Sequence, residues 1–297
     1  MIELLMDGIH LSFWWIMDHL LIINIILSIL IIFFQRRNPT TVWTWLLVLY
    51  FIPGLGFILY LVLGQNFHKD RMFRMKEIEG QVKYAVRKQG ESIYRRELRF
   101  RDPELDRYRQ LMLYNLNACE AVLTDNNDIR IYTDGKEKFK ALLWEMEHAR
   151  SYIHLQYYII KRDELWKQIE EVLIRKARQG VEVRVLFDSM GCRTMHNKDW
   201  ERLEAEGIHV AEFFPAVLGK LQLRVNYRNH RKIAVIDGRI GFVGGFNIGR
   251  EYLGRDPKFG YWRDTHLRIT GEAVMSLQIR FALDWNYATG ENLFKNE

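Results

Sequence analysis

The stretch that decides the fold is Asn226–Gly254, which reads N-Y-R-N-H-R-K-I-A-V-I-D-G-R-I-G-F-V-G-G-F-N-I-G-R-E-Y-L-G. Near its start, His230, Lys232 and Asp237 stand in the pattern H-x-K-x4-D. Side chains two residues apart on a strand leave the same face, so we expect the histidine and the lysine to point together. Their neighbours are apolar, and these two side chains are costly to bury there without an anionic partner. The motif therefore predicts a phosphate site, and we expect the aspartate to hold the turn after the strand.

A second motif, G-G-x-N, begins seven residues after this aspartate and consists of Gly244, Gly245 and Asn247. Glycines let a backbone approach a ligand closely, and the asparagine amide adds a donor for phosphate oxygens. We also expect Asn247 to cap a following helix, which would aim backbone N–H groups at the anion. H-x-K-x4-D alone is also compatible with a solvated lysine, a stray histidine and a turn aspartate. G-G-x-N at this spacing favours the phosphate site.

Outward from this stretch, residues 119–297 alternate between strand and helix patterns, which indicates an α/β sandwich with a mixed sheet. His154 and His266 fall on expected strands, where packing in the core is favoured over a place at the wall of a site. The expected strands are Ile129–Thr133, Tyr152–Ile160, Val181–Asp188, Ile208–Phe213, Lys232–Asp237, Ile240–Val243 and Thr265–Ile269, and the expected helices are Asp163–Gln179, Asn197–Glu206 and Glu272–Tyr287.

Residues 1–65 are almost wholly apolar and predict a membrane anchor with two transmembrane helices. Val42–Leu63 has 22 residues without a charge, which is enough to cross a hydrocarbon core of about 30 Å. Leu20–Phe34 is uncharged but has only 15 residues, and extending it back to Trp14 takes in Asp18. A cleaved signal peptide is the alternative, but the start of the chain is acidic rather than basic.

Residues 66–118 have the pattern of a basic helical linker that is broken at Asp102-Pro103. Asn66–Arg109 contains 13 Lys and Arg against 8 Asp and Glu, so this segment supplies +5 of the net charge of +6. Nucleic acid is one partner for a basic chain. Beside a membrane anchor, however, the segment favours anionic lipid head groups, and we expect no nucleic acid.

The side of the membrane follows from charges and cysteines. Two spans return the chain to its starting side, and the basic cluster Lys69–Lys76 predicts that this side is the cytoplasm, at the inner membrane. Arg36 and Arg37, in the link between the spans, count against this orientation. Cys119 and Cys192 form no disulfide framework, which suits reduced thiols facing the cytosol. No group of residues has metal-ligand spacing and no P-loop occurs, so we expect neither a metal nor a cofactor.

The segments N-H-R-K-I-x-V-I-D-G and G-F-V-G-G-F-N-I-G resemble the phospholipase D superfamily and, more narrowly, bacterial cardiolipin synthases. The resemblance continues through Tyr261–Ile269 (Y-W-R-D-T-H-L-R-I) and Arg36–Thr40 (R-R-N-P-T), and it covers nearly the whole chain. Arg250 stands where that family more often has an acid, and Glu272 where a proline is common. The resemblance implies that residues 119–297 form a phospholipase D-like domain, the first half of such an enzyme.

The resemblance also implies a two-step, metal-free exchange of phosphodiesters. His230 would attack phosphorus and form a phosphatidyl-histidine intermediate, while Lys232 and Asn247 would hold the non-bridging oxygens. Asp264 would accept a hydrogen bond from the far nitrogen of His230 and fix its tautomer. The alternative for Asp264 is a surface acid paired with Arg263.

As an enzyme of this kind, the chain would be an integral-membrane phosphatidyltransferase that joins two phosphatidylglycerol molecules into cardiolipin and releases glycerol. A hydrolase, acting as a phospholipase or nuclease, is the rival within the same fold, and a non-catalytic lipid-binding fragment is the rival from another class. H-x-K-x4-D occurs once, whereas the chemistry also needs an acid to protonate the leaving alkoxide. We therefore expect the front half of a longer enzyme, inactive or nearly so by itself. The alternative is a homodimer that places two copies of His230 across one phosphate.

Overall fold

The computed structural model describes residues 19, 22, 25–26, 28–29, 39–52, 55–56, 59–60, 76–100, 102–213 and 228–294. Two compact units make up the chain. A small N-terminal unit contains helix α2 (Pro39–Phe51), and a larger unit contains the seven-stranded sheet and the helices that pack on it.

The small unit holds the expected membrane anchor. Its helix α2 packs so that the rings of Trp45 and Tyr60 meet edge to face, with centroids 5.3 Å apart. Within the part of the chain that the structure describes, no helix combines the length and the apolar character needed to cross a membrane. Most of Leu20–Phe34 and the end of Val42–Leu63 lie outside the described residues. The two transmembrane spans therefore stay predictions.

The larger unit is built on a seven-stranded sheet with the order β1-β7-β6-β5-β2-β3-β4. Parallel pairing joins β2, β3 and β4, and antiparallel pairing joins the other neighbours. The prediction of an α/β fold with a mixed sheet is confirmed. The strands are β1 (Asp128–Asp134), β2 (Tyr152–Tyr157), β3 (Glu182–Asp188), β4 (His209–Phe213), β5 (Ile233–Ile236), β6 (Ile240–Gly244) and β7 (Arg263–Thr270).

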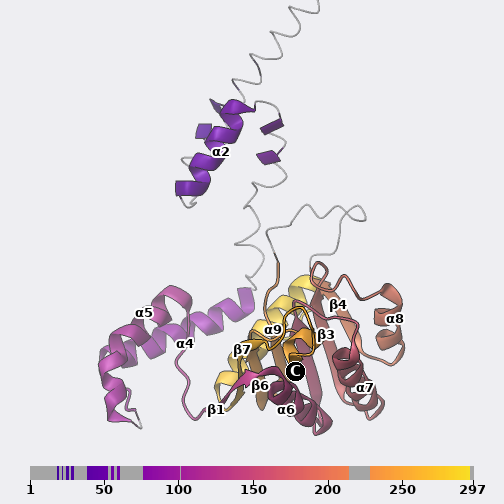
Figure 1. Ribbon diagram of the computed structural model, residues 1–297. Helices are drawn as coiled ribbons and strands as arrows, with labels where there is room; N and C mark the ends of the chain where they lie inside the picture. The colour runs from indigo at the N-terminus through magenta and orange to yellow at the C-terminus, as the bar shows by residue number, and fades with distance from the viewer. Residues whose placement is uncertain are drawn as a thin grey trace, which may run out of the picture. The chain divides into compact units, whose positions relative to one another are not determined.

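Helices cover both faces of this sheet (Figure 1). Ala234 and Ile236 of β5 belong to the core that the sheet shares with α6, α7 and α8. Ile233 and Val235, which alternate with them, pack with Val274 of α9 on the other face. The arrangement is a three-layer sandwich. The helices are α6 (Gly135–Glu147), α7 (Glu164–Arg178), α8 (Asn197–Ala205) and α9 (Ala273–Thr289).

Local signals explain where the helices begin and end. Asp134 and Asp163 each accept hydrogen bonds from two backbone N–H groups in the first turn of α6 and α7, and such a cap is worth about 1 kcal/mol. Helices α7 and α8 are followed by Gly180 and Gly207, whose φ angles of +87° and +80° favour glycine. The three expected helices are confirmed to within two residues at each end.

Helix α6 is an element that the sequence pattern does not predict. Lys138 and Glu145 lie on its buried face with exposed fractions of 0% and 8%, beside the apolar Phe139 and Leu142. Charged residues at buried positions interrupt the apolar period by which an amphipathic helix is recognised. The helix is therefore hidden in the sequence.

Four expected strands are shorter than predicted, and two of them stop or start beside the candidate site. β2 ends before Ile160, its predicted end, because the backbone N–H of Ile159 bonds the side-chain oxygen of Asn247 at 3.1 Å. β5 begins only after Lys232, whose ammonium instead contacts His230.

The described part of the expected linker, from residue 76 onward, is largely helical, and the break between its helices is longer than a single proline turn. Residues 95–108 separate the two long helices, and Asp102 caps the short helix that begins at Pro103. The side chain of Gln89 donates to the carbonyl of Leu123 at 2.8 Å and accepts from its N–H at 2.7 Å. The elements are α4 (Lys76–Tyr94), the 3-10 helix η1 (Pro103–Tyr108) and α5 (Arg109–Cys119).

Candidate active site

His230 lies in the segment Arg228–Lys232, which has no regular secondary structure and leads directly into β5. Because β5 starts opposite the end of β2, with Gln156 paired to Ile233, the segment lies at the sheet edge where β2 and β3 end. The imidazole is exposed, and its centroid is 4.4 Å from that of the Tyr158 ring. A substrate can therefore reach the ring.

Lys232 contacts the imidazole of His230 directly. Its Nζ lies 2.8 Å from Nδ1 and 3.3 Å from Nε2, and it donates to the backbone carbonyl of His230 at 2.7 Å. The lysine is only 3% exposed. Burial lowers its pKa to about 8, against the opposing effect of the Asp264 carboxylate. At pH 7 the ammonium thus remains mostly charged and can hold an anion beside the imidazole.

The imidazole of His230 is neutral at pH 7. Partial burial, and then the charge of Lys232, lowers its pKa below the ordinary value of 6.5, while Asp188 opposes the shift. A neutral imidazole has a nitrogen lone pair, which nucleophilic attack requires. The two motif residues thus combine a nucleophile with a cation.

The two glycines of G-G-x-N lie against atoms of the protein itself. A Cβ on Gly244 would come within 2.4 Å of the Cα of His266 in the neighbouring strand. A Cβ on Gly245 would come within 2.0 Å of a carboxylate oxygen of Asp264. Packing within the protein thus requires both glycines. The group that lies against Gly245 is the carboxylate of Asp264.

Asp264 does not make the hydrogen bond that we expected. Its carboxylate accepts from the N–H of Thr265 at 2.6 Å. Among the described residues, no hydrogen bond joins Asp264 to His230, and no ion pair joins it to Arg263. Its clearest electrostatic effect is on Lys232, whose pKa it raises.

Asn247 connects two loops at the site. Its side-chain oxygen accepts from the N–H of Ile159 at 3.1 Å, and its amide donates to the hydroxyl of Tyr252 at 2.8 Å. A second amide N–H is not used by these two bonds. The predicted helix cap is wrong, because the short 3-10 helix η2 (Arg250–Leu253) follows Gly249 and has no side-chain cap.

Asp237 holds the turn after β5, as expected. Its carboxylate accepts from the backbone N–H groups of Arg150, Ser151 and Tyr152 at 2.9, 2.7 and 2.9 Å. The residue has a φ of +52°, a conformation that aspartate tolerates better than most residues. The hairpin is thereby tied to the start of β2.

The two histidines on apolar strands are core side chains. His154 is 4% exposed, and its ring stacks between those of Tyr152 and Phe281 at 4.5 Å from each. Burial lowers its pKa to about 3, partly offset by a hydrogen bond with Gln278. His266 is 0% exposed, and neither ring nitrogen has a hydrogen-bond partner among the described residues. Burial lowers its pKa to about 2.

Sequence reasoning misses the residues that support the segment around His230. The Asp188 carboxylate accepts from the N–H of Asn229 at 3.0 Å, and that of Asp284 contacts Asn229 and Arg231. Asp188 ends a predicted strand, a place where functional residues gather in α/β folds, so that signal was available. Asp284 lies within a predicted helix and carries no such signal.

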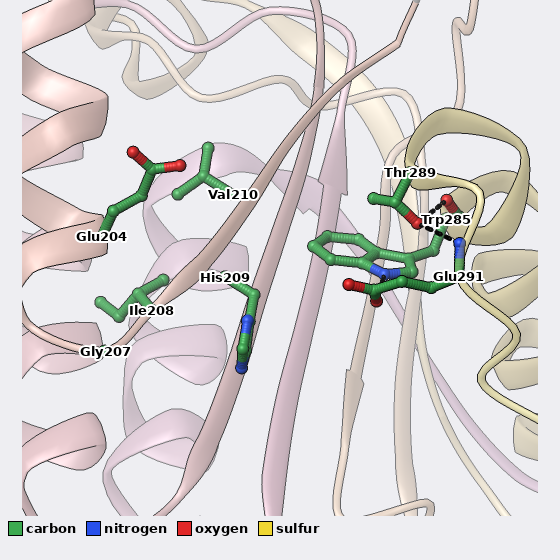
Figure 2. Close-up of a pocket in the computed structure, with 8 residues that line it drawn as sticks. All are labelled: Glu204, Gly207, Ile208, His209, Val210, Trp285, Thr289 and Glu291. Atoms are coloured by element: carbon green, nitrogen blue, oxygen red, sulfur yellow. Dashed lines mark hydrogen bonds between the residues drawn. The ribbon is translucent and has the colours of Figure 1, made fainter. Parts of the chain in front are cut away.

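A pocket of about 300 Å³ lies elsewhere in this unit, where β4 begins and α9 ends (Figure 2). Trp285 donates from its indole to Glu291 at 2.8 Å there. Since β4 runs parallel to β3, the start of β4 is at the sheet edge opposite His230. The pocket is therefore separate from the candidate site.

Comparison with known families agrees with this geometry. Residues 142–266 match the family described as "Cardiolipin synthase, PLD-like domain", and residues 22–65 match "Phospholipase_D-nuclease N-terminal". Residues 142–266 and 22–65 of this chain therefore match two segments of phospholipase D-like proteins.

Within that class, the chain is similar to cardiolipin synthases. It is 46% identical to a cardiolipin synthase of Oceanobacillus iheyensis over 277 residues, which are 93% of this chain and 58% of that protein. It is 46% identical to the major cardiolipin synthase ClsA of Bacillus subtilis over 90% of this chain and 56% of that one. It is 48% identical to a cardiolipin synthase of Staphylococcus aureus over 89% of this chain and 54% of that protein. The chain thus spans little more than half the length of these relatives.

Among solved structures, NucT from Helicobacter pylori aligns with 55% of this chain and 98% of that chain, with a TM-score of 0.44 and 14% identity. That likeness is too distant to bear on function.

Proposed function

We propose that this chain is the first catalytic half of a phosphatidyltransferase that joins two phosphatidylglycerol molecules into cardiolipin and releases glycerol. One observation carries the proposal: the neutral imidazole of His230 lies against the Lys232 ammonium in an accessible segment. The chain that contains this pair is 46–48% identical to cardiolipin synthases over 89–93% of its length.

The reaction has two displacements at phosphorus. A ring nitrogen of His230 attacks the phosphorus of one phosphatidylglycerol, and the bond to the glycerol oxygen breaks as that oxygen gains a proton. The hydroxyl of a second phosphatidylglycerol then loses its proton and attacks the same phosphorus, which breaks the P–N bond and yields cardiolipin. Lys232 stabilises the charge on the non-bridging oxygens. Asn247 contributes its remaining N–H, Gly245 makes room for Asp264, and Asp264 keeps Lys232 charged.

The proton for the leaving glycerol must come from outside this motif. His230 cannot attack phosphorus and protonate the opposite oxygen in one step. We propose that a second histidine motif supplies the acid, from a further segment of a longer protein. A second copy of this chain related by a two-fold axis is the other source.

We also propose that residues 1–65 anchor the protein in the inner membrane with two spans, that residues 66–118 are a linker, and that residues 119–297 form the catalytic domain on the cytoplasmic side. The apolar, uncharged segments and the match at residues 22–65 support this topology. Protease should cut the linker in inverted membrane vesicles but not in intact cells. Cleavage in intact cells would reverse the orientation.

Trapping the intermediate tests the catalytic proposal. The chain, purified together with the source of the second histidine motif, is mixed briefly with phosphatidylglycerol labelled at its phosphorus, and then denatured. We expect label on the protein that is stable to base and labile to acid, as for a phosphorus–nitrogen bond. His230→Ala should abolish the label, whereas His209→Ala, which replaces an exposed histidine at the opposite sheet edge, should not. Label that persists in His230→Ala would contradict the assignment of the nucleophile.

The same assay separates transfer from hydrolysis. Transfer yields labelled cardiolipin, and attack by water on the intermediate yields labelled phosphatidic acid. Predominant phosphatidic acid at saturating phosphatidylglycerol would show a phospholipase instead.

A further inference from the structure

Three hydrogen bonds converge on one buried oxygen behind the His230 segment. Oδ2 of Asp284 accepts from Nε2 of Gln156 at 2.6 Å, from Nδ2 of Asn229 at 3.1 Å and from Nη1 of Arg231 at 2.7 Å. Asp284 lies on α9 and is 0% exposed, and Gln156 on β2 is 1% exposed. One carboxylate thus ties a helix, a central strand and the His230 segment together.

Two of these donors are the immediate neighbours of His230 in the chain. Asn229 also accepts from the backbone N–H of Arg231 at 3.2 Å. The N–H of Asn229 itself donates to the carboxylate of Asp188 at 3.0 Å. The backbone on both sides of the imidazole is therefore fixed, although the segment belongs to no strand or helix.

The charge of Asp284 is expensive to bury and needs a cation. A fully buried carboxylate is tolerated when paired and hydrogen-bonded. Two cations face it, Arg231 and Arg280. The side chain of Arg231 is 37% exposed. Burial and the charge of Arg231 lower the pKa of Arg280, while the charge of Asp284 raises it. Oδ1 of Asp284 has no hydrogen-bond partner among the described residues. None of the hydrogen bonds in this network joins Asp284 to His230 or Lys232, so Asp284 can affect these two residues only through others.

We propose that Asp284 is a positioning residue, which holds Asn229 and Arg231 so that the imidazole between them stays against the Lys232 ammonium. The inference rests on the proposed role of His230 as the nucleophile. Its physical reason is that a reacting nitrogen must be held near its attack geometry, since a displacement of about 1 Å costs about 100-fold in rate.

The first test measures His230 without relying on turnover. Diethyl pyrocarbonate modifies neutral imidazoles, so its rate of reaction at His230 against pH, followed by mass spectrometry on the full chain, reports the pKa of that ring. The charged groups that set this pKa are Lys232, which lowers it, and Asp188, which raises it. In Asp284→Asn the segment loosens and the imidazole moves away from the ammonium. We expect the pKa of His230 to rise towards 6.5.

The second test measures catalysis. In the assembly that also supplies the second histidine motif, we expect Asp284→Asn to lower kcat for cardiolipin formation by about 10–100-fold with little change in KM, because only positioning is lost. Combining Arg231→Gln with Asp284→Asn should restore part of kcat, since the two new amide side chains can form a hydrogen bond and neither leaves an unpaired charge.

A matched control separates positioning from general stability. Glu170 is also a buried carboxylate, 5% exposed, and is paired with Arg202 on the far side of the unit from α9. Glu170→Gln should lower the thermal midpoint but leave kcat and the pKa of His230 unchanged. If Asp284→Asn does the same, Asp284 is only structural and the inference is overturned.

If Asp284→Asn does not fold, Arg231→Gln replaces it, since this side chain is 37% exposed and Arg280 remains as a second cation facing Asp284. Like Asp284→Asn, this variant should raise the pKa of His230 and lower kcat. If neither the pKa nor kcat changes, the inference is overturned. The two proposals fail separately. If His230→Ala keeps the covalent label, the proposed nucleophile is wrong, whereas a titration shift in Asp284→Asn still establishes the positioning.

Discussion

Replacing Asp237 separates the part of the H-x-K-x4-D motif that builds the fold from the part that meets the substrate. Its carboxylate accepts three backbone hydrogen bonds, from Arg150, Ser151 and Tyr152, and these tie the β5–β6 turn to the start of β2. The described structure shows no hydrogen bond from Asp237 to His230. We therefore expect a large effect on stability and a small effect on chemistry.

The size of the stability effect follows from the exposure of the three donors. A hydrogen bond to a charged group is worth about 1.5–3 kcal/mol. Arg150 and Ser151 are exposed, so water can replace the carboxylate there, and only the N–H of Tyr152 is partly buried. We expect Asp237→Gly to cost about 2–4 kcal/mol in the free energy of unfolding. Asp237→Ala should cost about 1 kcal/mol more, because a φ of +52° strains a residue with a Cβ. Asp237→Asn, which keeps one acceptor oxygen, should cost about 1–2 kcal/mol.

The assay is thermal unfolding of the detergent-solubilised full chain, followed by tryptophan fluorescence. The midpoints should fall in the order wild type, Asn, Gly, Ala. Well below these midpoints, the covalent label formed by Asp237→Asn should stay within about twofold of wild type. A folded Asp237→Asn that loses the label as completely as His230→Ala would refute the structural assignment.

Three further predictions concern the site and its surroundings. Cardiolipin formation should need neutral His230 and charged Lys232, so kcat should fall as the pH drops below the lowered pKa of His230 and as the pH rises through about 8. Lys232→Arg should move only the high-pH side of this profile, to higher pH. A high-pH side that does not move would contradict the assignment of Lys232. Gly245→Ala should displace the carboxylate of Asp264, since the added Cβ would lie 2.0 Å from it, and we expect a loss of activity of about 10-fold or more at an unchanged KM. His266 stays neutral in the folded protein down to about pH 2, whereas the unfolded chain binds that proton below about pH 6.5. The folded state should therefore lose up to about 1.4 kcal/mol per pH unit as the pH falls through this window, and His266→Phe should remove that acid sensitivity in thermal melts.

The sequence by itself determined the strands, three of the helices on the sheet, and the chemical pair at the site. Period-2 and period-3.6 patterns act over a few residues, so they placed the strands and the helix Glu164–Arg178 almost without tertiary information. His230 and Lys232 are two residues apart, and that proximity alone brings them into contact. The turn aspartate was likewise assigned from local chemistry.

Only the tertiary structure decided what surrounds that pair. Asn229 meets Asp188 and Asp284 across separations of 41 and 55 residues in the chain, and no local pattern records which distant carboxylate faces which amide. Helix α6 was hidden for a related reason: Lys138, on its buried face, finds the hydroxyl of Tyr157 at 2.9 Å. Whether a polar side chain can be buried depends on partners that folding brings from elsewhere. The nucleophile and its cation are thus local properties of this chain, and the network that holds them exists only once the sheet and α9 have packed.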